Sequence, residues 1–79
     1  MPRFYFHTED GRRLLDREGV DLPDLDAARR QAVRALGEIL KDRSDEFWAD
    51  GALRMSVCDE DGLTLFILEA TATTAPAVG

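Results

Sequence analysis

The apolar residues of this chain follow two spacings, one typical of strands and one typical of a helix. Aromatic residues in Arg3–Thr8 (RFYFHT) favour a strand, and Asp10-Gly11 favours a hairpin turn after it. The segment Leu14–Leu22 is predicted to be the antiparallel partner strand, with Gly19 at a bulge or bend. The chain is therefore expected to open with a hairpin.

The middle of the chain has the periodicity of an amphipathic helix. Pro23 stops the second strand because it has no amide hydrogen, and Asp24 can cap a helix by accepting from the amide of Asp26 or Ala27. We place the end of this helix near Arg43. Its apolar side is expected to lie on a sheet and consists of Leu25, Ala28, Ala32, Leu36, Ile39 and Leu40.

The second half of the chain predicts another hairpin. Phe47 and Trp48 are expected to tuck under the edge of the core. Leu53–Cys58 alternates apolar and polar residues, Asp59–Gly62 is a turn, and Leu63–Glu69 is rich in strand formers. A second pair of antiparallel strands follows from this pattern.

The predicted fold is α+β, with the order ββαββ: a four-stranded antiparallel sheet with one helix packed on one face. Residues 1–70 form the single domain, and residues 71–79 are expected to be a flexible C-terminal tail because they contain no large apolar residue. Gly37, inside the helix, is interpreted as a point of close packing on the sheet.

Composition restricts the possible functions. A chain of 79 residues has room for one small core and little room for a deep pocket. Its net charge of −6 disfavours nucleic acid as a partner. The N-terminus has no apolar signal segment and no stretch is long enough to span a membrane, so a cytoplasmic location is expected.

The chemistry-bearing residues do not form a recognisable active site. The single histidine, His7, and the single cysteine, Cys58, have no partners placed beside them by the sequence. A calcium loop with Gly62 at its sixth position would need oxygen ligands at Val57 and Leu68, which have none. We therefore expect a protein that is not an enzyme and has no cofactor and no metal.

Several phrases resemble a family of small bacterial proteins of unknown function. PRFYFH, EDG, GVDLPDLDAARRQA and VCDEDG stand in the order of that family's PRxFFH, LPDLEAAR and DExG phrases, as far as Leu68. The resemblance implies no activity and no site residues.

A weaker resemblance gives the alternative function. DLPDLDAARRQAVRAL is similar to the strand-to-helix junction of the HicB-like antitoxin domain, which implies an antitoxin-like or nucleic-acid-linked regulatory protein. The helix also presents three candidate contacts to nucleic acid, Arg29, Arg30 and Arg34. Pairing with Asp26 and Glu38 is the competing interpretation of these cations.

One helix can cover only one face of a sheet, which predicts an interface on the other face. If Phe4, Phe6, Val57, Leu65 and Ile67 pack under the helix, the candidate interface is Tyr5, Cys58, Phe66 and Leu68. If the in/out assignment of one strand is reversed, its residues predicted under the helix and its residues predicted in the interface are exchanged. We therefore expect a non-catalytic interaction domain that forms a homodimer or binds another protein through the open face or an edge strand.

Overall fold

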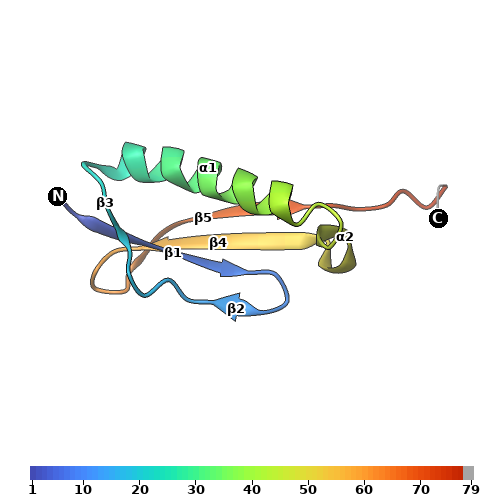
Figure 1. The fold of residues 1–79 in the computed structure, drawn as a ribbon, viewed down its shortest axis with the longest axis horizontal. Coiled ribbons are helices and arrows are strands. Elements are labelled where there is room, and N and C mark those ends of the chain that lie inside the picture. Colours follow the sequence, from blue (N-terminus) through green and yellow to red (C-terminus); the bar gives the residue numbers. More distant parts are fainter. Residues whose placement is uncertain (78–79) are drawn as a thin grey trace.

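A long helix lies across one face of an antiparallel sheet, as the two spacings predict (Figure 1). The structure is a computed structural model and describes residues 1–77. Its elements are β1 (Arg3–Glu9), β2 (Arg13–Leu14), β3 (Val20–Asp21), α1 (Leu25–Asp42), α2 (Phe47–Asp50), β4 (Ala52–Cys58) and β5 (Thr64–Thr71). The α+β class and the approximate order of the elements are confirmed.

Helix α1 begins and ends where its capping residues are. A side-chain oxygen of Asp24 accepts a hydrogen bond from the amide of Ala27 at 2.8 Å. At the other end, the amide of Arg43 donates to the carbonyl of Ile39 at 2.9 Å. The predicted cap at Asp24 is confirmed, because its side chain satisfies an amide that the helix itself leaves free. The predicted end of the helix near Arg43 is also confirmed.

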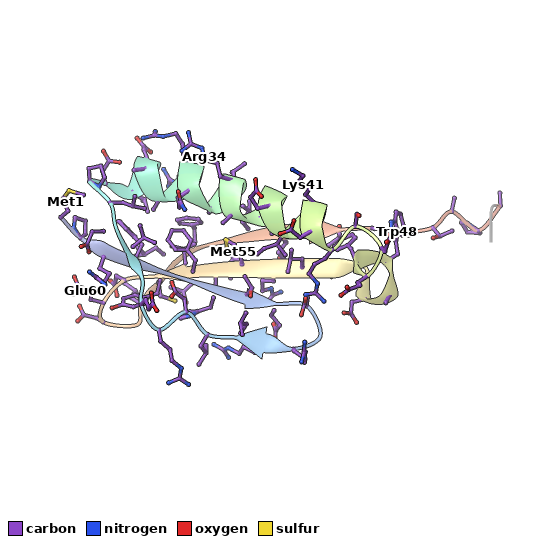
Figure 2. The ribbon with its side chains drawn as sticks, viewed as in Figure 1. Met1, Arg34, Lys41, Trp48, Met55 and Glu60 are labelled. Atoms are coloured by element: carbon purple, nitrogen blue, oxygen red, sulfur yellow. The ribbon has the colours of Figure 1, made fainter. Side chains whose placement is uncertain are left out.

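The core lies between α1 and the sheet. Ala28 and Ala32 are completely buried, and their small side chains allow the helix axis to approach the strands closely. Met55, from β4, is almost completely buried in the same core and is labelled in Figure 2. The other core residues that are buried are Phe4, Leu36, Leu53 and Val57.

The interpretation of Gly37 as a close-packing residue is wrong. Gly37 is exposed, and a Cβ atom built on it would meet no atom within 4 Å. It lies on the outer face of α1, away from the sheet.

Replacing Gly37 by alanine is therefore expected to raise the free energy of unfolding by about 0.5–1 kcal/mol, because it removes backbone entropy from the unfolded chain without a steric conflict. Urea titration followed by circular dichroism measures this change. A loss of stability would contradict the exposed position of this residue.

The sheet is built around β1 and β4. Its order is β2-β1-β4-β5, and β3 also pairs with β1, on the side that β2 occupies. All pairs are antiparallel. This order leaves β5 as one edge of the sheet and the short strands β2 and β3 as the other.

The predicted strand Leu14–Leu22 is wrong as a continuous element. Only Arg13–Leu14 and Val20–Asp21 pair with β1, and the residues between them leave the ladder. Asp16 lies in this gap and bonds to backbone amides through its side chain. Aspartate commonly competes with ladder pairing in this way, which the apolar pattern alone does not reveal.

The connection from α1 to β4 contains a short helix that was not predicted. Phe47 packs against the core as expected, but Trp48 is 60% exposed, so its predicted place under the core is wrong. Figure 2 shows Trp48 at the outer end of this connection. An ion pair between Arg43 and Asp10 joins the end of α1 to the turn after β1.

Strand β5 runs one residue past the predicted domain end at residue 70. It includes Thr71, and the amide of Ala72 donates to the carbonyl of Gly51 at 2.8 Å. The following residues extend away from the sheet (Figure 1). Residues 78 and 79 of the predicted tail lie outside the described residues.

Candidate functional site: the two edges of the sheet

Strand β5 presents a long, regular edge. It is eight residues long, contains no proline and carries one charged residue, Glu69. β4 pairs with one side of β5, and among residues 1–77 no strand pairs with the other side. The amides and carbonyls on this outer side are available to another strand.

The two faces of β5 differ from the predicted assignment. Phe66 and Leu68, predicted in the open-face interface, are half-buried and pack against the core under α1. Leu65 and Ile67, predicted under the helix, are 36% and 50% exposed. The correction follows from register, because Phe66 lies opposite the buried Val57 and opposite residues share a face.

A β-bulge explains why β5 could not be placed by alternation from the turn. Val57 pairs with Phe66, but the next residue, Cys58, pairs with Thr64, so Leu65 is an extra residue. Cys58 Sγ and Thr64 Oγ1 are 3.6 Å apart, which places these two side chains on the same face. The bulge therefore shifts every later side chain of β5 by one position relative to simple alternation.

The open face is polar over much of its area. Four side chains, Arg13, Glu9, Arg54 and Glu69, form a row of alternating charge across β2, β1, β4 and β5, because they are successive register partners. Arg54 and Glu69 form an ion pair at 3.5 Å. The apolar patch expected on this face is thus reduced to the strip along β5.

Tyr5 and Cys58 lie opposite each other on the open face, as predicted. The Cys58 side chain belongs to a residue that is only 7% exposed, however, and its hydrogen-bond contact is with Thr64. Tyr5 is half-buried. Of the four predicted interface residues, these two share the open face and Phe66 and Leu68 do not.

The other edge of the sheet is closed by a side chain. A carboxylate oxygen of Asp16 accepts from the amide of Phe6 at 3.1 Å, and the other accepts from the amides of Glu18 and Gly19, each at 3.1 Å. The Phe6 amide lies between the stretches of β1 that pair with β2 and β3. The side chain therefore replaces a strand at this point of the ladder.

Charge and hydrogen bonding both act on Asp16. Burial disfavours its charged form, but the amides of Gly19, Phe6 and Glu18 outweigh burial, and with a smaller contribution from His7 they hold the pKa of this carboxyl below its ordinary value of 3.8. The closure of this edge therefore depends on an ionised side chain.

His7 takes part in the same closure. Its Nδ1 atom accepts a hydrogen bond from the amide of Asp16 at 3.0 Å, and its register partner on β4 is Ser56. Cys58 lies in the neighbouring row of the sheet, opposite Tyr5. His7 thus has a structural hydrogen bond, and among the described residues no three metal-ligating side chains form a group.

The candidate nucleic-acid contacts lie on α1. Arg29 pairs with Asp26 at 3.2 Å, in agreement with the competing interpretation. Arg30 and Arg34 are exposed, and Figure 2 shows Arg34 on the side of α1 that faces away from the sheet. No helix of residues 1–77 combines the length and the hydropathy that crossing a bilayer requires.

Within residues 1–77, fold and site together define a small α+β domain with an open antiparallel sheet, in which Asp16 closes one edge and no strand pairs with the other. The chain belongs to the family described as a domain of unknown function, DUF6894, whose model matches residues 3–71. Comparison with curated proteins found no match, and comparison with solved structures found none. The expected membership of a family of unknown function is confirmed, and the HicB-like resemblance receives no support.

Proposed function

We propose that this protein is a non-catalytic interaction domain that binds a strand of another chain along the outer edge of β5. The observation that carries the proposal is the contrast between the two edges. Proteins commonly protect sheet edges with short strands, charges, proline or bulges. Here the edge formed by β2 and β3 has such protection, since its strands have two residues each and Asp16 occupies the gap.

Strand β5 has much less protection. Its single bulge is at Leu65, near its N-terminal end, and Glu69 is its single charge. Leu65 and Ile67 expose apolar surface beside the free backbone groups. An added strand would satisfy these backbone groups and cover this surface, which is the usual mode of recognition by strand addition.

Amide hydrogen exchange measured by nuclear magnetic resonance tests this proposal. In a free edge strand, the alternate amides that point away from β4 exchange quickly. The probe is a lysine-flanked peptide with the sequence of residues 63–72, LTLFILEATA. We expect these amides to be slowed by about tenfold or more, with the peptide or at high protein concentration.

Ile67→Lys is expected to abolish this protection, because lysine on an edge strand opposes pairing. The matched control is Leu14→Lys, since Leu14 is 71% exposed and lies on the closed edge. Fast exchange of the outer β5 amides under all conditions would refute strand addition, and so would equal effects of the two lysine variants.

The nucleic-acid-linked alternative rests on Arg30 and Arg34, which are exposed on one side of α1. It predicts that a labelled duplex oligonucleotide binds the protein and that Arg30→Ala with Arg34→Ala removes binding. The net charge of −6 opposes this alternative, and we expect no binding at physiological salt.

A further inference from the structure

We infer that the strand added at β5 comes from a second copy of this chain, paired antiparallel about a two-fold axis near Ile67. The inference rests on the proposed function of the β5 edge and names its partner. A two-fold axis perpendicular to the sheet makes the contact self-complementary and keeps both α1 helices on the same face. The two sheets then become one continuous sheet.

The register follows from the side chains of β5. Residues that lie directly opposite each other in an antiparallel pair share a face of the sheet. The core-facing residues of the two copies therefore lie opposite each other only if the two-fold axis passes through a residue position rather than between two positions. An axis at Glu69 would place two carboxylates directly opposite each other, which destabilises a strand pair. An axis at Leu68 would leave the two Glu69 positions only about 7 Å apart along the strands.

An axis at Ile67 avoids both problems. It places the two Ile67 side chains opposite each other on the open face and Phe66 opposite the partner's Leu68 on the core face. The two Glu69 positions are then about 13 Å apart along the strands. Two exposed isoleucines thereby cover each other, and the half-buried Phe66 and Leu68 lose their remaining contact with water.

Helix α1 supplies a second layer to this contact. A strand pair without packing on at least one face is only marginally stable in water, so apolar contact beyond β5 is needed. Ala35 and Ile39 line the groove of α1 that faces Leu14 and Leu15, on the β2 side. Val33 lies on the opposite flank of the helix by its angular position, which is the β5 side.

Val33 is an apolar residue that is not buried in the core of the monomer. It is 60% exposed, although it lies next to the buried Ala32. In the two-fold arrangement the β5-side flanks of the two helices face each other above the joined strands. Val33 of each copy then lies over the new Phe66 and Leu68 contacts.

Light scattering coupled to size exclusion, from about 10 μM to about 1 mM, tests the partner because self-association depends on concentration. We expect a mass of twice 8.8 kDa for the native chain at the upper end. Val33→Lys is expected to weaken the dimer by about tenfold or more. Gln31→Lys, which adds the same charge on the opposite flank of α1, is expected to leave the dissociation constant unchanged.

Cysteine cross-linking tests the register. Ile67→Cys is expected to form an intermolecular disulfide with mild diamide oxidation, since directly opposite Cα atoms of an antiparallel pair are about 4.5–5.5 Å apart, a separation that a disulfide can bridge. The two thiols lose their protons and two electrons to diamide, which is reduced to the hydrazine. Leu65→Cys is the control, because its counterpart in the partner would lie about 13 Å away. The native chain, with Cys58 buried, should not cross-link.

The outcomes separate this inference from the proposed function. A monomer at every concentration overturns the second copy as partner, while peptide-dependent protection of β5 would still support strand addition. A dimer that persists in Ile67→Lys lies at another surface and overturns the β5 dimer, and if the peptide also leaves the outer β5 amides unprotected the proposed function is overturned as well. Equal cross-linking at positions 65 and 67 overturns the register, and an unchanged dissociation constant for Val33→Lys overturns the helix contact.

Discussion

Replacing Asp16 by alanine is expected to lower the free energy of unfolding by about 2–3 kcal/mol, because three backbone amides lose a charged acceptor at once. These amides belong to Phe6, Glu18 and Gly19. A domain of this size has only about 3–5 kcal/mol to lose, so the variant should be partly unfolded at room temperature. The stability of Asp16→Asn should lie between that of the native chain and that of Asp16→Ala, since the amide group keeps one accepting oxygen.

Acid should remove the difference in free energy of unfolding between the native chain and Asp16→Ala. The pKa of Asp16 is lower in the folded state than its ordinary value of 3.8, so the unfolded state binds more protons between these values. The stabilisation that ionised Asp16 contributes is complete above its ordinary pKa and is lost as the pH falls through the lower pKa of the folded state. Urea titrations at about pH 6 and about pH 2 should show a large and a small difference, respectively. An equal difference at both would show that the carboxylate charge does not matter.

Gly19→Ala is expected to cost about 2–4 kcal/mol, from backbone strain and steric conflict together. Gly19 has a φ of +72°, which disfavours every residue with a Cβ atom. A Cβ atom here would also lie 2.9 Å from Cε2 of Tyr5 and 3.0 Å from the carbonyl oxygen of Phe4. The backbone at Phe4 belongs to β1 and cannot move without disturbing the sheet.

Gly62→Ala separates the two causes. Gly62 has a similar φ of +84°, but a Cβ atom built on it meets nothing within 4 Å. Its substitution should cost about 1–2 kcal/mol from strain alone. Thermal or urea unfolding of both variants gives the comparison, and equal losses would mean that contact with Tyr5 and Phe4 is unimportant.

The helix and the second hairpin were predictable because their signals are local. Asp24 caps α1 through an amide only three residues away, and the apolar spacing from Ala28 to Leu36 needs no information about the rest of the chain. The alternation in Leu53–Cys58 likewise matches the buried face of β4.

The candidate site was predicted less well because it depends on register. The faces of Phe66 and Leu68 are decided by pairing with β4 and by the bulge at Leu65, and neither is visible in the composition of the strand. The break in Leu14–Leu22 depends on Asp16 reaching the Phe6 amide, ten residues back. An aspartate within an apolar segment was the available signal for this break.

The pairing of β1 with β4 also determines how this chain must fold. The N-terminal strand finds its main partner about 50 residues later in the sequence, and α1 lies in the closed loop between them. The helix and the β4–β5 hairpin can each form from neighbouring residues, whereas β1 contributes its contacts only after this long loop closes. The rate of folding should therefore be limited by loop closure, and a nascent chain that ends before β4 would have the inner edge of β1 unsatisfied.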